Sequence, residues 1–144
     1  MSNELEILQD FKFKIQIQIA WIDMDLYGHV NNVNYLRYFE SARMRYLENF
    51  GFYDEYKKSG LAAVISKNTC NYLTPLIYPE LITVGARITE IQDDLILMEH
   101  FITRGDNSLS AFGETEMVIY DFKLAKRVKI PQLLAEKIRA FENM

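Results

Sequence analysis

The chain has 144 residues and a formal net charge of −4, with 49% apolar, 13% aromatic and 25% charged residues. This length predicts a single domain over residues 1–144, and the apolar fraction excludes a disordered or low-complexity chain. The acidic balance argues against a nucleic-acid partner, because nucleic-acid-binding surfaces are usually basic.

The first predicted element is a strand over residues 11–21. Its odd positions are Phe, Ile or Trp and its even positions are Lys, Gln or Ala, and this period of two is typical of a strand with one buried face. A polar segment at 23–29 follows, and Asn31 and Asn32 are favourable residues for a helix start. We therefore expect the longest helix to begin near Asn32 and to stop at Gly51, with apolar residues at spacings of three and four.

The sequence after Gly51 predicts one short helix, four strands and a last helix. The short helix at 53–59 ends at Gly60, and the last one is amphipathic and follows Ile130-Pro131. Turn-forming residues separate the strands, which are expected at 62–73, 81–91, 95–104 and 109–122. A strand, a long helix and then four strands do not alternate, so we predict an α+β protein in which a mainly antiparallel sheet packs on the helix.

Chemically useful side chains are concentrated between the first strand and the long helix. An aspartate there can attack a carbonyl group or activate water, and the unpaired N–H groups of a helix start can stabilise an oxyanion, which together suit acyl transfer. The alternative is structural: Asp23 and Asp25 form a turn, and Asn31 or Asn32 caps the helix. Spacing alone leaves both interpretations open.

The segment from Asp23 to Arg43 reads D-x-D-x-x-G-H-V-N-N-x-x-Y-L-x-x-F-E-x-A-R, and further characteristic stretches lie at 71–75, 78–84 and 127–131. This pattern resembles the hotdog-fold acyl-CoA thioesterases of the 4-hydroxybenzoyl-CoA thioesterase type, and the same stretch is similar to plant acyl-ACP thioesterases. The resemblance runs from Phe11 to the last helix. It implies a hotdog fold, in which a five-stranded antiparallel sheet wraps around one long central helix and a C-terminal helix follows.

The resemblance also implies roles for individual residues. Asp25 corresponds to the catalytic carboxylate, which acts as nucleophile or as general base, and Asn32 corresponds to the residue whose backbone N–H stabilises the oxyanion. His29 is a third catalytic candidate. The plant enzymes carry D-x-N-x-H here, but Tyr27 occupies the position of that Asn, so His29 either orients Asp25 or the substrate or simply hydrogen-bonds the turn. Another branch of the superfamily places its carboxylate on the long helix, where Glu40 lies, although pairing of Glu40 with a nearby arginine is the ordinary alternative.

The predicted reaction is hydrolysis of an acyl thioester, with acyl-CoA as substrate and without a cofactor or metal. The alternatives are an acyl-ACP thioesterase and a non-catalytic module that binds acyl-CoA. The candidate substrate-binding residues are Tyr27, Gly28, Glu40, Arg87 and Arg104.

Two further expectations concern the setting of the protein. Cys70 is the only cysteine, so no intrachain disulfide can form, and together with the lack of an apolar run of about 18 residues this favours the cytoplasm over a membrane. The sheet has edges that one chain cannot cover, and unpaired edges favour pairing between subunits. We therefore expect a homodimer or homotetramer with sites between subunits.

Overall fold

A computed structural model describes residues 8–144. Its antiparallel sheet has the strand order β1-β3-β4-β5-β2, and a short strand β6 pairs with β5. The long strands are β1 (Phe13–Gln18), β2 (Leu61–Tyr72), β3 (Leu81–Ile91), β4 (Leu95–Thr103) and β5 (Leu109–Asp121). The α+β class and the five long strands are thus confirmed, and the predicted strand ends agree with the structure to within two residues except in β1.

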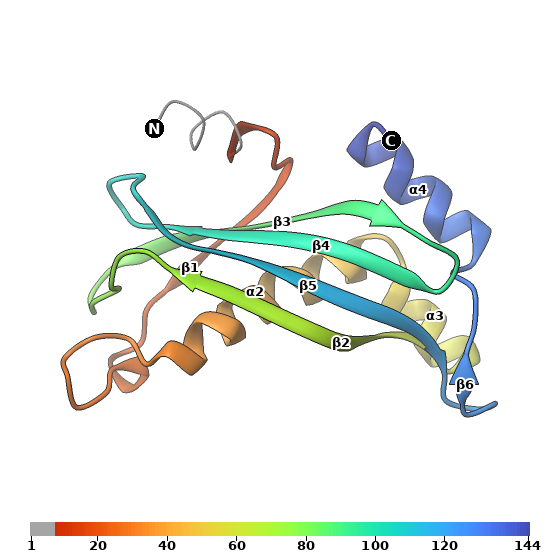
Figure 1. Ribbon diagram of the computed structural model, residues 1–144, viewed down its shortest axis with the longest axis horizontal. Helices are drawn as coiled ribbons and strands as arrows, with labels where there is room; N and C mark the ends of the chain where they lie inside the picture. The colour runs from red at the N-terminus through yellow and green to blue at the C-terminus, as the bar shows by residue number, and fades with distance from the viewer. Residues whose placement is uncertain (1–7) are drawn as a thin grey trace.

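The long helix α2 (Asn32–Asn49) runs along one face of the sheet (Figure 1). It begins where the sequence predicts because Asn31 is its N-cap, and the Asn31 side chain accepts a hydrogen bond from the Val33 N–H at 2.9 Å. It ends before Gly51, whose φ of +92° lies in the left-handed region that glycine adopts readily.

Two further helices lie near the C-terminal end of α2. Helix α3 (Phe52–Ser59) stops at Gly60, as predicted, and helix α4 (Gln132–Glu142) follows Pro131. The loop between β1 and α2 lies at the opposite end of the long helix (Figure 1). Among the described residues no helix is long and apolar enough to cross a membrane.

The core lies between α2 and the sheet. Phe39 and Ala42 of α2 are buried against the sheet face, and the side chains of alternate strand positions point toward the helix. The main buried cluster runs from Ile19, just after β1, to Ile138 of α4 and includes Ile82, Ile102 and Met117. A second, smaller cluster contains Leu8, Phe11 and Phe101.

Two details differ from the sequence prediction. The first strand is shorter than expected: Trp21 is 74% exposed and lies in the 3₁₀ helix η1 (Trp21–Asp23), so the apolar alternation continues past the point where pairing with β3 ends. The prediction of a strand up to Trp21 was therefore wrong. The strand β6 (Lys126–Arg127) was not predicted, because two residues are too few to show a period.

Candidate active site

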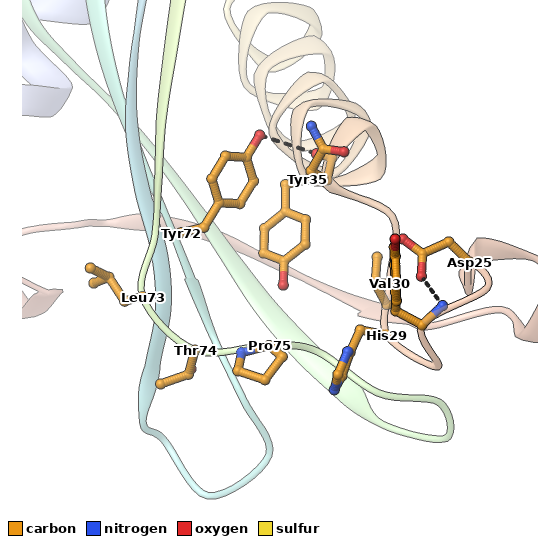
Figure 2. A pocket seen from close by; sticks show the side chains of 10 residues that line it. Asp25, His29, Val30, Tyr35, Tyr72, Leu73, Thr74 and Pro75 are labelled. Atoms are coloured by element: carbon orange, nitrogen blue, oxygen red, sulfur yellow. Dashed lines mark hydrogen bonds between the residues drawn. The ribbon is translucent and has the colours of Figure 1, made fainter.

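An open cavity of about 560 Å³ lies at the N-terminal end of α2. One side comes from the loop before α2, which contributes Asp25 and His29, and the other comes from the segment that follows β2 (Figure 2). Of the predicted catalytic and substrate-binding residues, the structure brings four together as lining of this cavity, namely Asp25, Tyr27, His29 and Asn32. Gly28 lies within the same loop.

Asp25 is held in a tight turn formed by its own neighbours. Its carboxylate Oδ1 accepts a hydrogen bond from the Tyr27 N–H at 2.8 Å, its N–H donates to the His29 carbonyl at 2.8 Å, and its carbonyl accepts from the Gly28 N–H at 3.0 Å. Gly28 closes the turn with φ +77°. The structural role that the sequence left open is therefore present, and the second carboxylate oxygen accepts no hydrogen bond from any described residue.

The first turn of α2 provides a hydrogen-bond donor to the same cavity. The N–H of Asn31 is bonded to the Asp23 carbonyl at 2.9 Å, and the N–H of Val33 is bonded to the Asn31 side chain. The N–H of Asn32, between them, has no acceptor within residues 8–144. A free N–H at a helix N-terminus, where the helix dipole is positive, is suited to stabilise an anionic oxygen.

Two tyrosines, Tyr35 and Tyr72, pack together at the start of α2. The Tyr72 hydroxyl donates to the Asn32 carbonyl at 3.2 Å, and the buried Tyr35 hydroxyl accepts from the Leu76 N–H at 3.1 Å. Their rings pack edge to face with centroids 4.9 Å apart. Burial raises the pKa of both hydroxyls, so both remain neutral.

The far wall of the cavity is formed by four residues for which no role was predicted, namely Tyr72, Leu73, Thr74 and Pro75 (Figure 2). These residues lie in the stretch 71–75 that carries part of the family resemblance. A signal was therefore present, but nothing in their chemistry indicated a role in the site.

His29 and the thiol of Cys70 differ in their relation to the site. The His29 side chain is exposed, lines the cavity and makes no hydrogen bond to a described residue, while its backbone carbonyl binds the Asp25 N–H. Cys70 does not line the cavity, and burial raises the pKa of its thiol, which disfavours the reactive thiolate.

The other three predicted substrate-binding residues lie in ion pairs and do not line the cavity. Exposed Glu40 faces buried Arg43 at 3.8 Å. Arg87 on β3 binds Glu99 at 2.8 Å, and Arg104 binds Glu80 at 3.3 Å. Between residues 8 and 144 no three His, Cys, Asp or Glu side chains come together as a metal-binding group.

The family is established by comparison with known proteins. Residues 19–138 match the model of the thioesterase-like superfamily, and the chain belongs to this superfamily. The long-chain acyl-CoA thioesterase FadM of Escherichia coli is 27% identical over 85% of this chain and 94% of its own length. The chloroplastic acyl-acyl carrier protein thioesterase ATL3 of Arabidopsis thaliana is 28% identical over 89% of this chain and 68% of its own length.

Solved structures agree with the family. The crystal structure of a thioesterase from Thermus thermophilus, in complex with coenzyme A and Zn, superimposes with a TM-score of 0.83 and is 26% identical, and the match covers 94% of this chain and 98% of that one. The fold is therefore the hotdog fold that the resemblance implies, with its sheet curled around α2.

Proposed function

We propose that this protein is a thioester hydrolase that cleaves acyl-CoA into a free acid and a thiol. The observation that carries the proposal is that Asp25 and Asn32 line the same cavity, and that within residues 8–144 one Asp25 carboxylate oxygen and the helix N-terminal N–H of Asn32 have no hydrogen-bond partner. The named activities of the relatives FadM and the Thermus thermophilus thioesterase support it.

In the proposed reaction the thioester carbonyl oxygen accepts a hydrogen bond from the Asn32 N–H. Asp25 either attacks the carbonyl carbon, so that an acyl-enzyme anhydride forms and water later hydrolyses it, or removes a proton from the water that attacks. In both routes the C–S bond breaks and the thiolate leaves. A thiol has a pKa of about 8.5, so its thiolate departs with little help from an acid.

The other loop residues have supporting roles in this proposal. His29 orients the substrate or Asp25 from the rim of the cavity, and Tyr27 and Gly28 shape the wall that the thioester passes. Arg87 and Arg104 are candidates for contact with the phosphates of CoA, which requires each to exchange the glutamate that it now binds. Glu40 is the alternative carboxylate, and its ion pair with Arg43 must open before it can act as a base.

A hydrolysis screen tests the proposal directly. The protein is incubated with acyl-CoA of increasing acyl length, and release of free thiol is followed with a chromogenic thiol reagent. We expect turnover by the wild type and its loss in Asp25→Asn. Binding of acyl-CoA without thiol release would contradict the proposal and favour the non-catalytic module.

The same acyl group on two carriers separates acyl-CoA from acyl-ACP hydrolysis. The similarity to ATL3 is the observation that favours the second candidate. We expect a higher kcat/KM with acyl-CoA, and the reverse order would assign the protein to the acyl-ACP thioesterases. No chelator effect is expected, because the proposed reaction uses no metal or cofactor.

We further propose that the active unit is a homodimer or homotetramer. Strand β2 is an edge of the sheet, and its residues Ser66, Lys67, Asn68 and Thr69 are all exposed. In the loop before α2, Leu26 and Tyr27 are 96% and 84% exposed. An exposed strand edge and large exposed apolar side chains each favour contact with a second copy. Light scattering at assay concentration tests this, and a fully active monomer would contradict it.

The setting of the protein is also a proposal. The main buried cluster, which runs from Ile19 to Ile138, supports a single domain over residues 1–144, and the lone Cys70 suits the reducing cytoplasm. Cell fractionation with an antibody to the protein tests the location.

A further inference from the structure

Asp23, two residues before Asp25, is the point at which the site loop is attached to α2. Its carboxylate oxygen Oδ2 accepts hydrogen bonds from the Tyr38 hydroxyl at 2.7 Å and from the Ala20 N–H at 3.1 Å. Its carbonyl oxygen accepts from the Asn34 side chain at 3.0 Å and from the Asn31 N–H at 2.9 Å. Three of these four donors belong to α2 or its N-cap.

Asp25 itself has no such attachment. Its three hydrogen bonds stay within its own turn, to Tyr27, Gly28 and His29. Asp23 is the residue nearest to Asp25 in the loop whose side chain is bonded to the helix. The distance between the Asp25 carboxylate and the Asn32 N–H therefore depends on how firmly Asp23 is held.

We propose that Tyr38 and Asp23 are positioning residues, which hold the Asp25 loop at a fixed distance from the N-terminus of α2 during thioester hydrolysis. This inference rests on the proposed function of the cavity. Neither residue lines the cavity, so both act through Asp25 and Asn32 and not on the substrate.

Tyr38 is suited to this task. It is 5% exposed and projects from α2, so its own position is set by the helix and the core. Burial and the adjacent Asp23 carboxylate both raise the pKa of the Tyr38 hydroxyl, and the hydroxyl therefore remains a donor throughout the pH range of an assay. A hydrogen bond from a neutral hydroxyl to a carboxylate is charge-assisted and stronger than one between neutral groups.

The chain provides a matched control at the other end of the same helix. Tyr46 is fully buried, and its hydroxyl donates to the Glu142 carboxylate at 2.6 Å. Tyr38→Phe and Tyr46→Phe therefore remove the same kind of bond from the same helix. Only the first bond holds the site loop.

The first experiment compares these two variants in the thiol-release assay. For Tyr38→Phe we expect kcat to fall about tenfold while KM stays within about twofold, because a small displacement of reacting groups slows the reaction more than it weakens binding. For Tyr46→Phe we expect kcat within about twofold of the wild type and a decrease in Tm similar to that of Tyr38→Phe. Equal kcat values in the two variants would overturn the proposal.

Asp23 allows a test by a conservative replacement. Asp23→Asn keeps an oxygen that can accept from Tyr38, whereas Asp23→Ala removes it. We expect Asp23→Asn to retain a kcat several-fold above that of Asp23→Ala, with both measured below their unfolding temperatures. Identical kcat values would overturn the positioning role of the carboxylate.

Hydrogen exchange gives a readout that does not depend on activity. The Asn31 amide binds the Asp23 carbonyl, so it should exchange faster in Tyr38→Phe than in Tyr46→Phe. Unchanged exchange, even with a lower kcat, would overturn the proposal. If the wild type releases no thiol from any acyl-CoA, the proposed function fails, and the exchange rates still decide whether Tyr38 holds the loop.

Discussion

The two ends of α2 are built for different purposes. At the N-terminal end the helix meets an open cavity, a half-buried Asp25 and a loop whose Leu26 is 96% exposed. At the C-terminal end the helix meets a closed aromatic cluster, in which the Phe50 ring lies 4.8 Å from Tyr46 and 5.2 Å from Phe141. One helix thus borders the Asp25 cavity at its first end and a packed aromatic cluster at its last.

The two ends of α2 contain the same kind of hydrogen bond in different surroundings. Each end has one tyrosine that donates to a carboxylate, to Asp23 at the first end and to Glu142 at the second. At the second end this bond joins α2 to α4 inside the core, whereas at the first it joins α2 to a loop at the surface. Reactive groups are usually carried by such loops, and the rigid helix and sheet hold them in place.

Removal of the aromatic cluster should produce the largest effect. Phe50→Ala deletes a buried ring (7% exposed) and leaves a cavity between α2 and α4, so we expect the free energy of unfolding to fall by about 3 kcal/mol. Denaturant unfolding measures this, with the exposed Lys137→Ala on α4 as a control that should change it by less than about 0.5 kcal/mol. At temperatures where the variant remains folded, kcat should be close to the wild-type value, and a large loss of kcat would contradict the division between the two ends.

The opposite result is expected at the N-terminal end. Asp25→Asn keeps the size of the side chain and an oxygen that can accept from Tyr27, so the fold should persist while kcat falls by at least about a hundredfold. Circular dichroism and Tm provide the check on folding. A folded variant with near wild-type kcat would show that Asp25 is not the catalytic carboxylate, and Glu40→Gln would then be the next variant to measure.

His29→Ala should have a smaller effect than Asp25→Asn. The His29 ring is exposed and forms no hydrogen bond with a described residue, so its removal should lower kcat by about tenfold or less, as expected for a group that only orients others. Parallel measurement of the two variants with one acyl-CoA substrate decides the order. A greater loss at His29 would reverse the assignment of the two residues.

The fold was largely predictable from sequence because its elements have clear periods and clear ends. The alternation before Gln18 and the Asn31 cap mark a strand and a helix start without any knowledge of tertiary contacts. The first strand was predicted too long because Trp21 continues the alternation of apolar residues. The pairing between β1 and β3 ends earlier, at Gln18 with Leu81. Where pairing stops depends on the partner strand, which a local pattern does not contain.

The candidate site was predictable only in part, for a related reason. Asp25 and Asn32 lie close together in the chain, so their combination is visible in one short segment. The hydrogen bond of Tyr38 is not visible in the sequence. A tyrosine on a helix face occupies the same position in the sequence pattern whether its hydroxyl contacts a carboxylate or water. The burial of Arg43, at 5% exposure, is hidden in the same way, since charged residues are expected at the surface.

The middle of α2 packs against a buried histidine, His100, which should make the free energy of unfolding depend on pH. His100 of β4 is fully buried and stacks on Phe39 with ring centroids 4.9 Å apart, and its Nδ1 lies 3.2 Å from the Gly85 carbonyl. This contact fits a neutral ring with the proton on Nδ1, since Nε2 has no partner among residues 8–144.

Burial, and then the charge of nearby Arg43, lower the pKa of His100 to about 3. In the unfolded chain a histidine has a pKa of about 6.5, so the unfolded state binds a proton first as the pH falls. The stability associated with neutral His100 is therefore complete above pH 6.5 and decreases as the pH falls toward 3. Between pH 6.5 and 5.5 we expect the free energy of unfolding to decrease by about 1 kcal/mol from this group. Denaturant unfolding at both pH values measures this decrease. In His100→Gln the decrease in the free energy of unfolding between the two pH values should be smaller by about 1 kcal/mol. A wild type and a folded His100→Gln with equal pH dependence would show that His100 is not kept neutral by the packing beneath α2.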